Sequence, residues 1–244
     1  MTAPKTGGRL AGRLALVTGA SRGIGRAVAL RYAAEGAHTI LVARTRGGLE
    51  EVDDAIRKAG GVPATLVPLD LRDGAKIDEM GGALYRRFGR IDVLVANAAV
   101  LGPMSPLAHV DPKRWDEAVA VNLTANFRLI RSLDPLLRLS PSGRAIFVTS
   151  SAGRIPKAYR GVYGATKAGL DMLVRTYSAE TEKTDIRVNL VDPGAVRTAM
   201  RAEFLPGEDP LTVKPPETLG DLFVELGEAS CQRHGEILLA PNPA

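Results

Sequence analysis

Tyr163 and Lys167 lie four residues apart in the sequence Tyr163-Gly164-Ala165-Thr166-Lys167. Residues at this spacing share one face of a helix, so the Lys167 ammonium can favour the ionised form of the Tyr163 phenol. A tyrosine whose pKa falls below its ordinary value of roughly 10 could exchange protons with a substrate. Most pairs at this spacing are solvated and carry no chemistry, so the rest of the chain decides between the two interpretations.

Two hydroxyl side chains, Ser150 and Ser151, precede this pair and follow the apolar run Ala145-Ile146-Phe147-Val148. The two serines and the Tyr163–Lys167 pair thus form a set of polar side chains that follows one apolar run.

A glycine-rich turn, Thr18-Gly19-Ala20-Ser21-Arg22-Gly23-Ile24-Gly25, directly follows the apolar run Leu14-Ala15-Leu16-Val17. Glycines in such a turn allow a tight bend and a close approach of the backbone to a pyrophosphate, and the N-terminus of the next helix attracts negative charge. The turn predicts a phosphate-binding site, and a glycine turn without a ligand is the alternative.

Short runs of Val, Ile and Leu recur along the chain and are typical of strands buried on both faces of a parallel sheet. Segments with helical signals lie between them, with Asp73 and Asp111 as expected N-caps and a proline after the second. We expect strands at Leu14–Thr18, Thr39–Val42, Ala64–Val67, Ile91–Val95, Ala145–Val148, Ile186–Val191 and Glu236–Leu239, and helices at 25–35, 49–59, 73–88, 115–139 and 163–183.

This alternation predicts an α/β fold, a doubly wound parallel sheet of about seven strands with helices on both faces and ligands at the carboxyl ends of the strands. We expect residues 1–12 to form a flexible lead and residues 13–244 to form one domain. Prolines in the segment 195–216 indicate a loop, with room for a short helix, near the ligand.

The composition excludes several classes of protein. The chain of 244 residues is 45% hydrophobic and 24% charged, and no long apolar block precedes Leu14, which argues against a secretory signal or a membrane anchor. A single cysteine, Cys231, rules out an internal disulfide and favours the cytoplasm. The three histidines lack metal-ligand spacing, so we expect no metal. The net charge of +5 comes with scattered arginines, which argues against nucleic acid.

The order of the Gly-x-x-x-Gly-x-Gly turn, Ser150, Tyr163 and Lys167 resembles the short-chain dehydrogenase/reductase family across nearly the whole chain. The tetrad Ala96-Asn97-Ala98-Ala99 resembles the family's Asn-Asn-Ala-Gly element, although its first and last residues differ. The resemblance implies a Rossmann-like domain that transfers a hydride between nicotinamide C4 and a carbonyl or secondary alcohol.

The resemblance also implies individual roles. Tyr163 would be the general acid or base, Ser150 rather than Ser151 the partner of the carbonyl oxygen, Lys167 the stabiliser of tyrosinate and ligand of the nicotinamide ribose, and Asn122 the residue that holds a proton-relay water. The cofactor would lie against Gly19, Ser21, Arg22, Gly23, Ile24, Gly25, Arg44, Asp70, Leu71, Asn97, Tyr163, Lys167, Pro193, Gly194, Val196 and Thr198.

The choice between NAD and NADP can be argued from charge. An NAD site usually carries an acidic residue after the second strand, and that carboxylate would repel a 2′-phosphate. Here Arg44 stands at this place, and Arg22 lies in the glycine turn. Because a guanidinium group can grip a phosphate through its planar fork, we expect NADP(H). Arg46 could assist, but it is more simply a solvated loop residue.

The substrate is expected to be a small carbonyl or alcohol compound, in a pocket formed by residues 100–107, 154–159 and 195–216. Candidate lining residues are Leu101, Met104, Ile155, Tyr159, Phe204 and Leu205, with Arg154, Lys157 and Arg201 as candidates for an acidic group. The family resemblance implies a homodimer or homotetramer. The alternative function is a non-catalytic NADP(H)-binding sensor or scaffold.

Overall fold

The computed structural model describes residues 7–240, and within them the expected doubly wound sheet is confirmed. All seven strands pair in parallel in the order β3-β2-β1-β4-β5-β6-β7. Their bounds are β1 Leu14–Thr18, β2 His38–Ala43, β3 Thr65–Pro68, β4 Val93–Ala96, β5 Arg144–Val148, β6 Arg187–Asp192 and β7 Ile237–Leu239.

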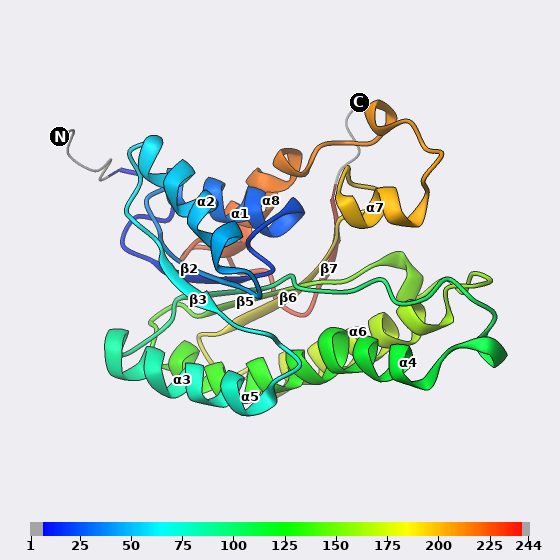
Figure 1. Ribbon diagram of the computed structural model, residues 1–244. Coiled ribbons are helices and arrows are strands. Elements are labelled where there is room, and N and C mark those ends of the chain that lie inside the picture. The colour runs from blue at the N-terminus through cyan, green and yellow to red at the C-terminus, as the bar shows by residue number, and fades with distance from the viewer. Residues whose placement is uncertain (1–6, 241–244) are drawn as a thin grey trace.

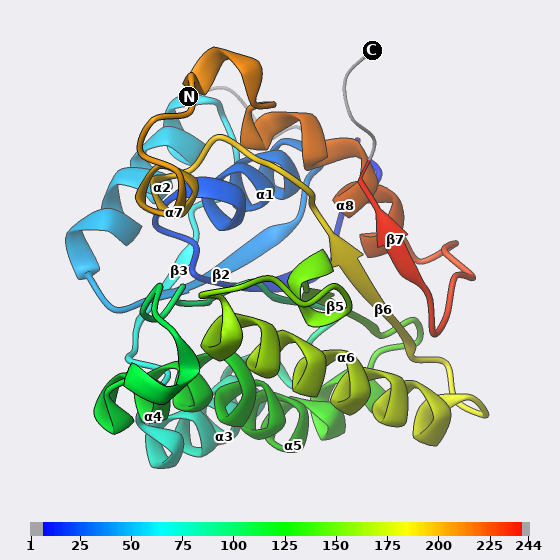
Figure 2. The same cartoon turned by 90° about the vertical axis from the view of Figure 1, so that its right-hand side faces the viewer.

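Helices cover both faces of this sheet (Figure 1). The upper layer in that view consists of α1 (Gly23–Ala34), α2 (Arg46–Lys58) and α8 (Gly220–Gly227). The lower layer consists of α3 (Gly74–Phe88), α4 (Pro112–Val119), α5 (Ala125–Arg138) and α6 (Gly161–Thr181). Figure 2 shows the remaining helix, α7 (Ala199–Phe204), on the same side as α1 and α2.

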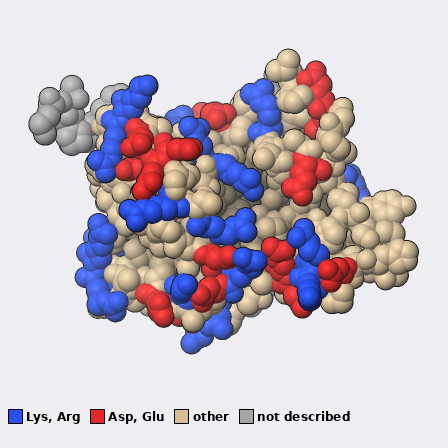
Figure 3. Space-filling view, in the orientation of Figure 1, with Lys and Arg blue, Asp and Glu red and all other residues tan. Residues whose placement is uncertain are grey.

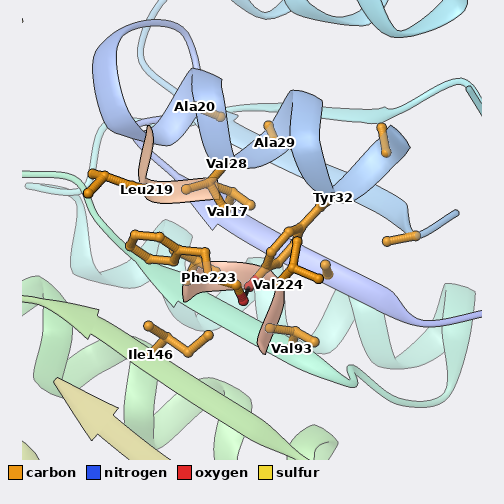
Figure 4. Close-up of a cluster of buried hydrophobic side chains, with 14 of the residues drawn as sticks. Val17, Ala20, Val28, Ala29, Tyr32, Val93, Ile146, Leu219, Phe223 and Val224 are labelled. Atoms are coloured by element: carbon orange, nitrogen blue, oxygen red, sulfur yellow. Dashed lines mark hydrogen bonds between the residues drawn. The ribbon is translucent and has the colours of Figure 1, made fainter. Parts of the chain in front are cut away.

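Each helix layer buries its own apolar cluster against the sheet. In the upper cluster, Val17 and Ile146 of the sheet meet Val28 of α1 and Phe223 of α8 (Figure 4). The Tyr32 hydroxyl is also buried there and donates to the Phe223 carbonyl at 2.7 Å, so its polar atom is satisfied. The lower cluster packs α3, α5 and α6 beneath the strands. Burial on both faces explains why the strand sequences are continuous apolar runs rather than alternating ones.

The N-caps predicted at Asp73 and Asp111 are confirmed. The Asp73 side chain accepts from the Lys76 amide and begins α3, and the Asp111 side chain accepts from the Lys113 amide ahead of Pro112 in α4. Gly89 closes α3 in the left-handed conformation. The proline-rich segment 195–216 carries the short helix α7, as the sequence allowed.

The expected helix over residues 115–139 differs from the observed structure. The chain forms α4, then one π-helical turn at Ala120–Thr124, then α5. A π turn inserts an extra residue into the helix and rotates the side chains that follow. This turn contains Asn122, whose side chain is buried.

The expected flexible lead over residues 1–12 also differs from the observed structure, which describes its residues 7–12. Leu10 is fully buried in the upper cluster, and its amide donates to the Glu35 carbonyl at 3.0 Å. Arg9 pairs with Glu228. Residues 7–12 are therefore packed on the domain, because Leu10 reaches the core of that domain. Residues 1–6 of the predicted lead lie outside the described residues.

Candidate active site

A cleft of about 550 Å³ opens at the carboxyl ends of the strands. Loops after β1 to β6 supply its walls, as expected for a doubly wound sheet. Its lining brings together every cofactor and catalytic candidate except Gly25 and Asn122: Gly19, Ser21, Arg22, Gly23, Ile24, Arg44, Asp70, Leu71, Asn97, Ser150, Tyr163, Lys167, Pro193, Gly194, Val196 and Thr198. In the part of the chain that is described, no group of three or more His, Cys, Asp or Glu side chains is placed to hold a metal ion.

The glycine turn shapes one end of the cleft. Gly19 and Gly23 adopt positive φ angles of 66° and 56°, which other residues rarely adopt. Gly25 has a different role, because a Cβ atom there would lie 2.3 Å from the Gly19 carbonyl oxygen. The three glycines thus allow the turn and the close contact between turn and helix that a dinucleotide site requires.

The N-terminus of α1 is open toward this cleft. Its N-cap residue, Arg22, makes no side-chain cap, and the first turn contains no acidic residue. The first amides of a helix lack partners within the helix and favour an anion at that end. These features of the turn and helix fit a bound pyrophosphate.

Thr18 is a functional position that the sequence reasoning missed. Its Oγ1 accepts from the amides of Asn97 at 2.9 Å and Ala98 at 3.0 Å, and Asn97 Nδ2 donates to the Thr18 carbonyl. The threonine therefore fixes the loop after β4 to the glycine turn after β1. Its position at the end of a β-branched strand run concealed this role.

Arg22 and Arg44 are exposed on the wall of the cleft, and neither takes part in an ion pair among residues 7–240. Figure 3 shows basic side chains near the middle of this face, where the surface is hollowed. Arg46, by contrast, lies outside the lining and pairs with Glu50 at 2.8 Å. The nearby Asp70 carboxylate is bound by Arg72, whose guanidinium lowers the pKa of Asp70.

Tyr163 and Lys167 lie on the first two turns of α6, against the end of β5. Lys167 is almost fully buried, and its Nζ donates to the Val148 carbonyl at 2.7 Å. The same nitrogen lies 5.7 Å from the centre of the Tyr163 ring. Ser150, directly after β5, lines the cleft and interacts with the Tyr163 hydroxyl.

The expectation of a lowered pKa for Tyr163 is wrong in this structure. Burial raises the pKa of Tyr163 to about 12, although the hydrogen bond with Ser150 opposes the rise. Burial also lowers the pKa of Lys167 to about 8, against the attraction of Asp171 and Asp192. Desolvation outweighs the pairing because it penalises both charged forms, and the lysine nitrogen is bound to a backbone carbonyl. The phenol therefore stays protonated at neutral pH.

Asn122 lies behind the cleft rather than in its lining. It is completely buried, Oδ1 accepts from the Val100 amide at 2.8 Å, and Nδ2 donates to the Val100 carbonyl and to Thr166. The π turn thus directs this amide inward, away from the solvent, and ties the loop after β4 to α6. Only a break in the helical periodicity could have indicated this from the sequence.

A buried ionic network supports Lys167 from the other side. Arg154 donates to the carboxylates of Asp171 on α6 and Asp192 at the end of β6, and Thr149 donates to Asp171. Both carboxylates are buried. Arg154 is therefore a structural residue that joins three segments of the site, not a free group for an acidic substrate.

Replacing Arg154 by Ala should destabilise the fold by about 3 kcal/mol, because it removes the cation that is hydrogen-bonded to two buried carboxylates. Chemical denaturation measures this change in the free energy of unfolding. The control is Arg114→Ala, which breaks an exposed pair with Glu117 and should cost less than about 1 kcal/mol. Equal losses in the two variants would contradict the role given to Arg154.

The loop after β6 forms the remaining wall. Gly194 has a φ of 65°, and its amide donates to Asp192 Oδ1 at 3.1 Å. Val196 is buried and forms an isolated parallel β-bridge with Lys214. The Thr198 side chain caps α7 by accepting a hydrogen bond from the Arg201 amide. Of the substrate candidates, Leu101, Lys157, Arg201 and Phe204 line the cleft, whereas Met104, Arg154, Ile155, Tyr159 and Leu205 do not.

Comparison with known proteins agrees with this arrangement. Residues 13–209 match the family model described as short chain dehydrogenase. The oxidoreductase YciK of Escherichia coli K12, whose function is uncharacterised, is 35% identical over 226 residues, which are 91% of this chain and 89% of the relative. A 2,3-dihydro-2,3-dihydroxybenzoate dehydrogenase of Bacillus subtilis is 36% identical over 78% of this chain and 72% of its own length.

Solved structures show the same fold at high similarity. A short chain dehydrogenase from Escherichia coli CFT073, complexed with NADPH, superposes with a TM-score of 0.93 at 34% identity over 98% of this chain and all of the other. One from Shigella flexneri, complexed with NADP, gives a TM-score of 0.91 at 34% identity over 95% of this chain and 98% of the other.

Proposed function

The chain belongs to the short-chain dehydrogenase family of oxidoreductases, and from that premise we propose that it uses NADP(H) to interconvert a carbonyl group and a secondary alcohol. The observation that carries the proposal is that Ser150, Tyr163 and Lys167 converge on the same cleft as the glycine turn. A panel of carbonyl compounds with NADPH, followed by loss of NADPH absorbance, tests it.

The free charges of the cleft support NADP(H) over NAD(H). Arg22 and Arg44 line the cleft and form no ion pair among residues 7–240, while Asp70, a candidate for a repelling carboxylate, is held by Arg72. Two guanidinium groups can bind a 2′-phosphate through charge-assisted hydrogen bonds. Two structural relatives of this chain were solved with NADP or NADPH, which agrees with the choice.

The catalytic roles follow from what each side chain can donate. When bound, the dinucleotide supplies or accepts the hydride. Tyr163, with its pKa raised to about 12, stays protonated at neutral pH and donates its proton to the carbonyl oxygen during reduction. Ser150 donates a hydrogen bond to the same oxygen as negative charge develops there.

Lys167 and Asn122 support this chemistry from α6 and the π turn. Lys167 uses one of its three donors on the Val148 carbonyl, which leaves others for the nicotinamide ribose. Its charge favours the tyrosinate left after proton transfer. Asn122 holds the backbone of Val100 and the Thr166 hydroxyl, and we assign it the positioning of a relay water.

Replacing Ser150 by Ala should lower kcat by about 100-fold or more, because it removes a donor to the developing oxyanion. Steady-state kinetics on the best carbonyl of the panel measures the loss. Ser151→Ala is the matched control, since that side chain is the neighbouring hydroxyl on the same turn, and its kcat should change little. A larger loss in Ser151→Ala would transfer the catalytic role to Ser151.

A non-catalytic NADP(H) sensor or scaffold is the less favoured function. A sensor would need the glycine turn and the arginines, but it would not need a serine, a tyrosine and a buried lysine in one cleft. Binding of NADPH without reduction of any carbonyl in the panel would favour the sensor.

We also propose a homodimer or homotetramer. Large apolar side chains are exposed on the lower helix layer, including Phe127 of α5 and Met172 of α6, with 48% and 66% of their surfaces accessible. Pairing these helices with a second copy would cover the exposed apolar side chains.

No helix among residues 7–240 has the length and apolar character that crossing a membrane requires.

A further inference from the structure

A second basic group lines the cleft next to the candidate proton donor. Lys157 and Arg160 come from the loop between β5 and α6, and Arg201 comes from α7. Arg160 is the N-cap residue of α6, three residues before Tyr163. Arg160 and Tyr163 therefore both line the cleft from the start of the same helix.

The three cations of this group differ in whether an acidic side chain neutralises them. Arg201 is neutralised by Glu208, with nitrogen–oxygen distances of 2.5 and 2.6 Å. Lys157 and Arg160 take part in none of the ion pairs among the described residues 7–240. Lys157 is exposed at the rim, whereas Arg160 is partly buried. Arg160 is therefore the partly buried cation at this end of the cleft that forms no ion pair among residues 7–240.

The aromatic ring of Phe204 holds Arg160 in place. The Cζ atom of Arg160 lies 3.8 Å from the centre of this ring, and that of Arg201 lies 5.5 Å from it. A guanidinium group stacked on an aromatic face keeps the N–H donors on its edge free. That edge matches the planar fork of a carboxylate. Burial and the nearby Arg201 lower the pKa of Arg160, so an anion would also be favoured electrostatically.

This basic group is separate from the one assigned to the dinucleotide. Arg22 and Arg44 follow β1 and β2, whereas Arg160 follows β5, and β4 lies between β1 and β5 in the sheet. The two groups thus follow strands on opposite sides of β4. Arg160 accompanies Ser150 and Tyr163 at the reacting end.

We propose that Arg160, stacked on Phe204, binds a carboxylate of the substrate, so that the enzyme acts on oxo acids and the corresponding hydroxy acids. This inference rests on the proposed oxidoreductase function and deepens it. Glu208 neutralises Arg201, and Lys157 is exposed at the rim, so Arg160 is the partly buried cation of this group that matches a single negative charge. The carboxylate orients the substrate, and Ser150 and Tyr163 act on its carbonyl oxygen.

Binding of matched acid and ester probes tests the proposal. The probes are 2-oxobutyrate, acetoacetate and levulinate, each with its methyl ester, titrated by calorimetry into the protein saturated with NADP+, with which an oxo compound cannot react. At least one acid should bind about tenfold or more tightly than its ester, which is the expected scale for a charge-assisted hydrogen bond. Arg160→Gln should abolish this preference, and Arg160→Lys should keep part of it because the charge remains.

The control variant is Arg175→Gln, which removes the same charge from an exposed position on the same helix, outside the cleft, and should keep the full preference. Binding of every acid no tighter than its ester in the wild type, or an unchanged preference in Arg160→Gln, overturns the carboxylate site. A loss of NADPH affinity in Arg160→Gln that matches the loss of the acid preference also overturns it, since Arg160 would then hold the cofactor.

The failure of this inference is distinguishable from failure of the proposed function. Reduction of neutral carbonyls and esters without an acid preference removes the carboxylate site and leaves the oxidoreductase. Acid-selective binding without NADPH oxidation by any carbonyl leaves the site and removes the oxidoreductase.

Discussion

Tyr163→Phe should lower kcat by about 10²- to 10⁴-fold, the range expected when a general acid is removed. The phenol is the group on the cleft wall that can give a proton to a carbonyl oxygen, and burial keeps it protonated by raising its pKa to about 12. The change deletes one hydroxyl group and keeps the ring that packs beside Lys167. Steady-state kinetics should therefore show a large fall in kcat, while the dissociation constant for NADPH changes little.

Tyr85→Phe is the matched control for this prediction. Tyr85 is 56% exposed on α3 and lies outside the cleft, so its variant should keep normal turnover. A Tyr163→Phe variant with near-normal kcat would remove Tyr163 from the chemistry. A variant that loses NADPH binding together with turnover would instead give the hydroxyl a role in holding the cofactor.

Arg44→Asp should lower kcat/KM with NADPH by about 100-fold or more, because it removes a charge-assisted hydrogen bond and adds a carboxylate that repels a 2′-phosphate. With NADH, which has no such phosphate, kcat/KM should stay the same or rise. Arg44 is exposed on the cleft wall after β2 and forms no ion pair among residues 7–240. Parallel kinetics with the two cofactors measures the change in preference.

Arg46→Asp is the matched control for the cofactor prediction. It makes the same change of charge two residues away, at a side chain that pairs with Glu50 and does not line the cleft. Its preference for NADPH should therefore remain. A wild-type protein that uses NADH as well as NADPH would contradict the assignment of Arg22 and Arg44 to the phosphate.

The fold could be predicted from the sequence because its signals are local. Each strand is a mostly apolar run of three to six residues, and Asp73, Gly89 and Pro112 mark helix ends through their own backbone preferences. The burial of Leu10 and the π turn at Asn122 could not be predicted in this way. Both depend on contacts with segments far along the chain, Glu35 in one case and Val100 in the other.

The candidate site was predictable as a set of residues but not as an electrostatic arrangement. Most of the named residues line one cleft because the carboxyl ends of parallel strands lie on one edge of the sheet. The spacing of Tyr163 and Lys167 suggested a lowered tyrosine pKa, whereas burial raises it. Arg154 was a candidate for binding substrate, yet Asp171 and Asp192 bind it. Spacing along a helix does not reveal how deeply a group is buried or which distant carboxylate it meets.

The most direct test of the account is whether hydrogen passes from the cofactor to the carbonyl carbon. The wild-type protein would be given NADPH that carries deuterium at both C4 positions, with the best carbonyl compound of the panel, and the product analysed by mass spectrometry. We predict an alcohol with one deuterium on the former carbonyl carbon. NADPH that binds and is left unchanged by every carbonyl in the panel, or an alcohol without deuterium, would contradict the account.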